Sequence, residues 1–149
     1  MWQRHWQAKQ EIRAVLGSMP SVGPTTIEVV ISEIGDLERF RSNKRLVAYA
    51  GLAPGHRESA GRKKDLGITK EGSRLLRWAL VQTAWRTLRC SLRWRCVYEN
   101  LKKRRGCKRA IVAVARRLLT VMTALWRTGQ RYRLDSGGLR GMPTLAPAK

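Results

Sequence analysis

The chain has 149 residues, a length that fits one domain with a substantial buried core. Hydrophobic residues make up 43% and charged residues 28% of it, values that exclude a wholly disordered chain and a fibrous protein. The 31 Lys and Arg against 10 Asp and Glu give a formal net charge of +21, which predicts a polyanionic partner, nucleic acid ahead of an anionic membrane surface.

The excess positive charge is concentrated in the second half of the chain. Residues 57–133 hold 22 basic and four acidic residues, whereas residues 1–56 hold seven and five. No stretch approaches about 18 uninterrupted apolar residues, and the amino terminus lacks the apolar run of a signal peptide. We therefore expect a cytoplasmic protein without a membrane partner.

The first third of the chain has the apolar spacing of short helices. It predicts helices over residues 4–16 and 25–34, joined by a turn that contains two prolines and a glycine. Ser42 is placed to cap a third helix that ends near Gly51. These elements predict a compact helical cluster.

The rest of the chain reads as a loop and two helices. Residues 52–67 combine proline, glycine and polar side chains, which predicts a long irregular loop. Residues 73–101 lack proline and glycine and predict one helix on the order of 40 Å long. Residues 107–127 predict a second helix antiparallel to it, so the expected fold class is all-α.

The tail is rich in glycine and proline over residues 134–149 and is predicted to be disordered, which leaves residues 1–133 as the domain. The three cysteines, Cys90, Cys96 and Cys107, are odd in number and include no CxxC pair. This pattern favours neither a metal site nor disulfides, and we expect reduced, partly buried side chains.

The turn at residues 19–26 (MPSVGPTT) resembles the helix-hairpin-helix motif. In that motif a glycine-rich turn and the helix start after it bring backbone N–H groups to a DNA phosphate, here at Gly23 and Thr25. Ser21 stands where the motif usually has its first glycine. An ordinary connection between two helices remains the alternative.

The predicted loop places a serine, Ser59, among small neighbours and basic residues. A serine that attacks a phosphodiester needs a deprotonated oxygen and cations that stabilise the phosphoryl charge. His56 is the nearest candidate base. The candidate cations are Arg57, Arg62, Lys63 and Lys64. By itself this pattern is also that of a solvated turn.

Several separated motifs occur in one order along residues 11–133: MPSVG, SEIGDLERF, GLAP with a serine five residues later, ITKEGSRLLRWAL and AVARRLL. This order resembles the carboxy-terminal domain of insertion sequence 110/116/902 family transposases. The resemblance implies a DNA-binding domain that acts in transposition and recombination. It also implies that Ser59 is the nucleophile that links covalently to DNA, although Ala60 replaces the glycine that usually follows that serine.

The resemblance further implies an amino-terminal RuvC-like domain whose acidic residues bind Mg²⁺, a guide RNA, and a homo-oligomer in the intact enzyme. Residues 1–18 are too few for such a domain. We therefore expect a separated part of a transposase that holds no cofactor and is inactive alone. The acids at Glu28, Glu33, Asp36 and Glu38 are better explained as helix caps and solvated charges than as metal ligands.

The two basic helices interleave arginines and lysines with Trp78, Trp85 and Trp94. Exposed tryptophans would stack on bases, but core positions are the favoured interpretation. Together with Lys70 before the first of these helices, the candidate phosphate contacts of this region are Arg74, Arg77, Lys108 and Arg109. The alternatives are a non-catalytic module that binds DNA or RNA and, more remotely, a membrane-surface protein.

Overall fold

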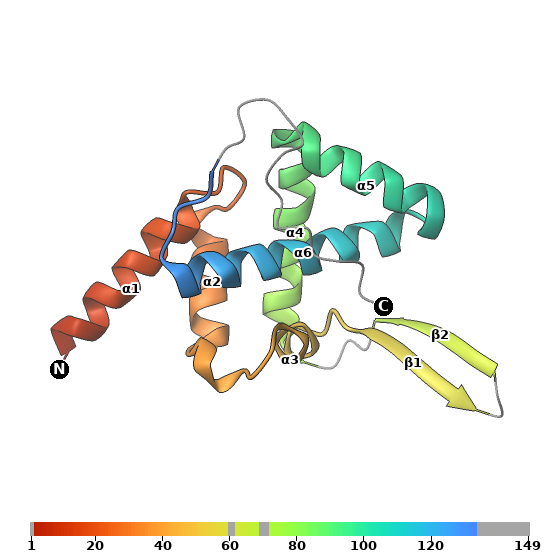
Figure 1. Ribbon diagram of the computed structural model, residues 1–149, viewed down its shortest axis with the longest axis horizontal. Helices are drawn as coiled ribbons and strands as arrows, with labels where there is room; N and C mark the ends of the chain where they lie inside the picture. Colours follow the sequence, from red (N-terminus) through yellow and green to blue (C-terminus); the bar gives the residue numbers. More distant parts are fainter. Residues whose placement is uncertain (1, 60–61, 69–71, 134–149) are drawn as a thin grey trace.

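Six α-helices form the body of the domain, and a two-stranded hairpin projects from it (Figure 1). The computed structural model describes residues 2–59, 62–68 and 72–133, and these counts refer to them. The all-α class is confirmed for the body. The elements are α1 (Trp2–Gly17), α2 (Pro24–Ile34), the 3₁₀ turn η1 (Leu37–Arg39), α3 (Asn43–Tyr49), β1 (Pro54–Ser59), β2 (Arg62–Ile68), α4 (Arg74–Cys90), α5 (Leu92–Arg105) and α6 (Cys107–Thr128).

The predicted amino-terminal cluster is present as α1, α2 and α3. Pro24 occupies the first turn of α2, where its missing N–H costs no helical hydrogen bond. The Ser42 side chain caps α3 by accepting from the Arg45 N–H. Arg13 on α1 donates to both carboxylate oxygens of Glu28 on α2, at 2.5 and 3.0 Å, and this hydrogen bonding lowers the pKa of Glu28. Local signals therefore set these boundaries correctly.

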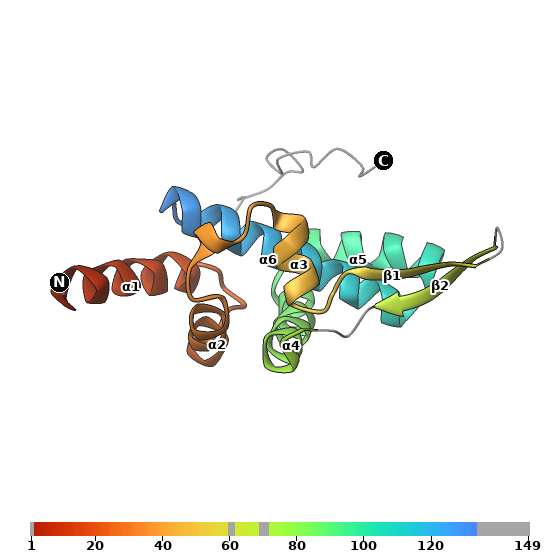
Figure 2. The same cartoon turned by 90° about the horizontal axis from the view of Figure 1, so that it is seen from below.

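Helix α6 lies at the centre of the core. It contacts α1, α3, α4 and α5 and runs across the body (Figures 1 and 2). One side of α6 is apolar along its length, as the 3.6-residue period requires of a buried helix. Its fully buried side chains are Ala110, Val114, Ala115, Leu118 and Leu119. On α4 the fully buried side chains that join the same core are Leu76, Leu80 and Ala84.

The prediction of one long helix over residues 73–101 is wrong, because the chain turns at Ser91. Ser91 has extended backbone angles (φ −133°, ψ 117°), ends α4 and caps α5 by accepting from the Trp94 N–H. Arg95 donates back to the Leu88 carbonyl at 3.1 Å, which satisfies a free carbonyl at the end of α4. The turn buries Trp94 and leaves Leu92 exposed at the corner. The antiparallel pair is consequently α5 with α6, while α6 crosses α4 (Figure 1).

The prediction of an irregular loop over residues 52–67 is also wrong, because most of it forms the antiparallel hairpin β1–β2. Cα partners run from Pro54 with Ile68 to Ser59 with Arg62, with a register shift near Pro54. The sequence lacks the apolar alternation of a strand packed on a core. The hairpin extends away from the helices (Figures 1 and 2), so backbone pairing satisfies it and the alternation is not needed.

The root of the hairpin is fixed to the core at both ends. Before β1, Leu52 is fully buried. After β2, the Ser73 N–H donates to the Tyr49 carbonyl at 3.0 Å, and the Ser73 hydroxyl donates to the Glu33 carboxylate. Gly72 lies between them with φ +121°, and a Cβ there would stand 2.1 Å from the Tyr49 oxygen. Only glycine fits this close approach.

Replacing Gly72 with alanine should therefore destabilise the domain more than the same change at Gly106. Both glycines have positive φ, but no atom lies within 4 Å of a Cβ at Gly106. Gly106→Ala should cost only the backbone strain, about 1–3 kcal/mol, whereas Gly72→Ala adds a clash with backbone. Urea denaturation of both variants measures the difference. Equal losses would contradict the close contact at the hairpin root.

Candidate nucleic-acid interface

The strongest concentration of charge lies where α5 meets α6. Six exposed cations flank the connection at Gly106, and we call them the basic corner: Lys102, Lys103, Arg104, Arg105, Lys108 and Arg109. Figures 1 and 2 both place this corner and the hairpin at the end of the molecule away from α1. The fold thus gathers much of the charge excess near the hairpin.

Helix stability accounts for only part of the basic corner. Cations in the last turn of α5 interact favourably with the negative end of that helix. Lys108 and Arg109 stand instead in the first turn of α6, where the helix dipole disfavours positive charge. A phosphate group at this helix start would be attracted by the dipole and by both side chains.

Arg116 on α6 is only partly exposed to solvent. Burial lowers its pKa, and repulsion from Arg105 and Arg117 lowers it further. A bound phosphate would offset the desolvation and the repulsion at once. The electrostatics of this region therefore favour a polyanion.

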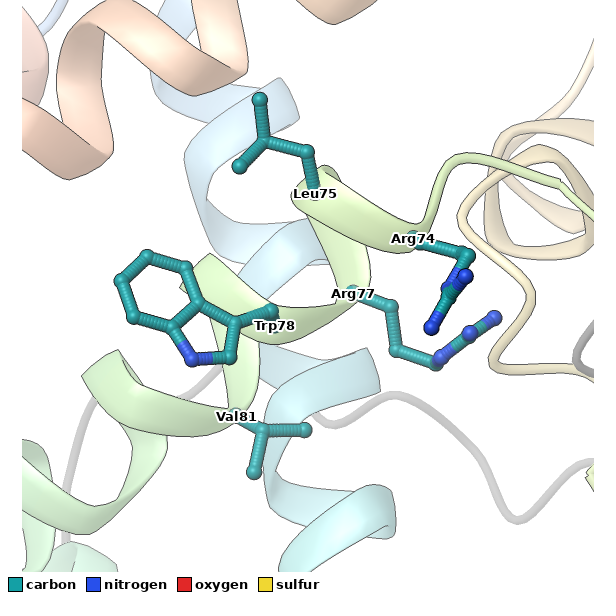
Figure 3. A pocket seen from close by; sticks show the side chains of 5 residues that line it. All are labelled: Arg74, Leu75, Arg77, Trp78 and Val81. Carbon is teal, nitrogen blue, oxygen red and sulfur yellow. The ribbon is translucent and has the colours of Figure 1, made fainter.

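The first turn of α4 carries a second group of cations, Arg74 and Arg77. Figure 3 shows their side chains extending together on one side of the helix, whereas Leu75 and Trp78 point elsewhere. This turn directly follows the root of the hairpin at Gly72 and Ser73. The structure thus brings these two predicted phosphate contacts close to the hairpin base.

The predicted nucleophile, Ser59, is the last residue of β1, and its Cα partner is Arg62. Arg57 pairs with Lys64, and the pairing also brings Lys63 opposite Glu58. The four predicted cations of this segment therefore share one hairpin with Ser59. Lys70 lies outside the described residues.

The helix-hairpin-helix-like turn lies beside the second half of α4, away from the hairpin root. Nη1 of Arg86 is 3.3 Å from where a Cβ on Gly23 would stand. The first i→i−4 hydrogen bond of α2 runs from the Ile27 N–H to the Gly23 carbonyl, and no side chain caps this helix start. The Thr25 N–H precedes that bond, in the position of a phosphate donor.

Metal and membrane features were sought over the described ranges. No group of three or more His, Cys, Asp or Glu side chains comes together there in a way that could hold a metal ion. Likewise, none of the helices in those ranges is long and apolar enough to cross a membrane.

Comparison with known families decides the class of protein. Residues 13–99 match the model of the transposase IS116/IS110/IS902 family. The chain belongs to this family. The match begins in α1 and ends in α5, so it includes the hairpin and the whole of α4.

Similar proteins include mobile-element transposases and a DNA-inverting protein. The transposase for insertion sequence element IS1111A of Coxiella burnetii is 34% identical over 124 residues, 78% of this chain and 33% of that protein. The pilin gene-inverting protein of Moraxella bovis is 32% identical over 122 residues, 80% of this chain and 38% of that protein. The family member described here therefore spans about a third of the length of these relatives.

The sequence did not locate all exposed groups of this transposase-family chain. Trp94 is buried as expected, but Trp78 and Trp85 are 54% and 42% exposed, so core positions are wrong for these two. The three cysteines are free, as expected, but exposed and not partly buried. The nearness of Arg86 to Gly23 joins residues 63 positions apart, and no local pattern indicates it.

Ser21, which departs from the motif's usual glycine, has a structural role. Its side chain is buried, and its hydroxyl hydrogen bonds to the Thr87 hydroxyl at 2.7 Å. A second buried pair, Thr26 and Thr83, hydrogen bonds at 3.0 Å. These two contacts connect the turn and α2 with α4.

Ser21→Ala should lower the free energy of unfolding by about 1 kcal/mol, because it leaves a buried hydroxyl with one partner fewer. Ser32→Ala is the matched control, since the exposed Ser32 hydroxyl contacts only the Val29 carbonyl of its own helix. Its change should stay within about 0.5 kcal/mol. Chemical denaturation compares the two, and a Ser21→Ala domain as stable as the control would contradict the contact.

Proposed function

We propose that this chain is the DNA-binding and strand-cleaving domain of a transposase, with Ser59 as the nucleophile. The observation that carries the proposal is the placement of the Ser59 hairpin at the same end of the molecule as the basic corner (Figures 1 and 2). Family membership supports a role in transposition. The name of the pilin gene-inverting relative supports a role in recombination.

DNA binding in this proposal uses two kinds of contact. The basic corner, Arg74 and Arg77 neutralise phosphates, and release of counterions from DNA drives association. At the helix-hairpin-helix-like turn, the backbone of Gly23 and Thr25 holds one further phosphate, with Arg86 beside it. Contacts of both kinds fix the position of DNA without reading its sequence.

Affinity for a DNA duplex should fall steeply between about 50 and 200 mM salt. The double variant Lys108→Ala with Arg109→Ala should weaken binding and reduce the slope of log K against log salt by roughly 2, since each lost phosphate contact removes about 0.9. Fluorescence anisotropy with a labelled duplex measures both quantities.

The matched control removes Arg4 and Lys9, two exposed cations of α1 at the far end of the molecule. The double variant Arg4→Ala with Lys9→Ala should leave the slope nearly unchanged. A flat salt response of the unmodified chain, or equal losses in both double variants, would contradict the proposed interface.

The proposed cleavage is a transesterification. The Ser59 Oγ attacks phosphorus and forms a Ser–O–P bond, while the bond from phosphorus to one deoxyribose oxygen breaks. The serine proton passes to a base and finally to the departing deoxyribose oxygen, so one phosphodiester replaces another. The cations of the hairpin stabilise the charge on the phosphoryl oxygens.

The register of the hairpin supports part of this assignment. Positions 57 and 59 share one face of β1 by the two-residue period, and their partners at 64 and 62 belong to the same face of the ladder. Position 56 alternates to the other face. The proposal therefore groups Arg57, Arg62 and Lys64 with Ser59, and it gives no base role to His56.

Other parts of the intact enzyme complete the proposal. A separate acidic domain binds Mg²⁺ and helps to activate the serine, a guide RNA selects the DNA, and copies of the enzyme associate. No step is assigned to a metal ion held by the described residues of this chain.

Mixing the chain with its native element ends, guide RNA and a separately supplied acidic domain should give a protein–DNA adduct that survives denaturant. Ser59→Ala should abolish this adduct and leave DNA binding within about twofold, because the hydroxyl contributes to chemistry and not to charge. Gel electrophoresis under denaturing conditions detects the adduct, with Ser32→Ala as the matched serine control. An adduct that persists in Ser59→Ala, or salt-dependent binding with no adduct in any mixture, would instead support a non-catalytic module.

A further inference from the structure

Helix α4 presents an apolar stripe to solvent near the root of the hairpin. Leu75 is 49% exposed and Trp78 is 54% exposed, and Trp85 continues the stripe two helical turns further on. The same chain buries Trp94 to 2%, so it does not leave tryptophan exposed for lack of a core. Large exposed rings on one side of a helix mark an interaction surface.

This stripe borders an open hollow of about 760 Å³ that is lined by Arg74, Leu75, Arg77, Trp78 and Val81 (Figure 3). Leu75, Trp78 and Val81 supply the apolar part of the lining. Arg74 and Arg77 supply positive charge on the neighbouring side of the same turns. The hollow thus combines an aromatic face with cations.

A nucleotide matches this combination because it joins a flat apolar base to an anionic phosphate. A protein segment that covered Leu75 and Trp78 would have to bring acidic groups for Arg74 and Arg77 as well. Stacking of bases on exposed tryptophan requires unpaired bases, since a duplex keeps its base faces stacked on one another. The chemistry of the hollow therefore favours single-stranded nucleic acid over duplex.

We propose that Trp78 is a stacking platform for an unpaired DNA base, with Arg74 and Arg77 binding the adjoining phosphates. The inference rests on the proposed function in one respect, the choice of DNA as the strand. Exchange of strands requires that bases beside the cleaved phosphodiester leave their duplex. The hollow follows the hairpin root by one helical turn, so a strand cleaved at the hairpin has this surface as its neighbour.

The test compares binding of a 15-nucleotide thymidine strand and a 15-base-pair duplex by the full chain. Trp78→Ala should weaken binding of the single strand by roughly 5- to 100-fold, as expected for loss of base–aromatic stacking. Duplex affinity should change less than twofold. Trp78→Tyr should retain most of the single-strand affinity, whereas Trp78→Leu should lose as much as Trp78→Ala, because leucine is apolar but cannot stack.

The matched control is Trp6→Ala, which removes a 62% exposed tryptophan from α1 and should leave single-strand affinity unchanged. Retained affinity in Trp78→Leu, equal losses for strand and duplex, or an equal loss in Trp6→Ala would overturn the stacking platform. So would a Trp78-dependent affinity for a uridine strand of the same length without one for the thymidine strand. Self-association that Trp78→Ala abolishes, measured by sedimentation, would assign the stripe to a second copy of the chain and overturn the proposal as well.

Failure of this inference is distinguishable from failure of the proposed function. Salt-dependent duplex binding that persists without any effect of Trp78→Ala rejects only the stacking platform. Loss of single-strand affinity in Trp78→Ala, with no covalent adduct at Ser59, retains the platform and rejects the nucleophile.

Discussion

The packing of α4 against α6 is the contact on which the rest of the structure depends. Fully buried Leu76, Leu80 and Ala84 of α4 join the core that α6 crosses. The amino-terminal end of α4 fixes the hairpin root through Ser73, and its second half holds the helix-hairpin-helix-like turn through Thr87. One buried helix therefore positions both the hairpin and the turn. Because protein cores are close-packed, a shift of α4 would move both features together.

The charge of the domain opposes the compactness that this core provides. Residues 57–133 fold with 22 basic and four acidic residues, and cations at the α6 helix start and around Arg116 repel one another. Apolar burial offsets this repulsion in the absence of a partner. A polyanion that binds only the folded chain removes part of the repulsion and so stabilises the fold. In this account DNA binding and stability are linked through the basic corner.

Local signals in the sequence predicted the elements whose boundaries local chemistry decides. Pro24, Ser42 and the period of residues 107–127 identified α2, α3 and α6. The turn at Ser91 was missed because no proline or glycine marks it; burial of Trp94 and the Arg95 contact decide it instead. The hairpin was missed because a strand pair that projects from the core needs no apolar alternation. At the candidate site, family resemblance identified Ser59, while the exposure of Trp78 and the approach of Arg86 to Gly23 depend on tertiary packing.

The central claim is that the Ser59 hairpin and the basic corner form one DNA-binding end of the molecule, away from α1. Photo-crosslinking tests it most directly: a photoreactive residue replaces Ser59 in one variant and Trp6 in another, and each is irradiated with bound duplex. The account predicts efficient covalent capture of DNA from position 59 and little from position 6. Equal capture from both positions, or capture from position 6 alone, would contradict it.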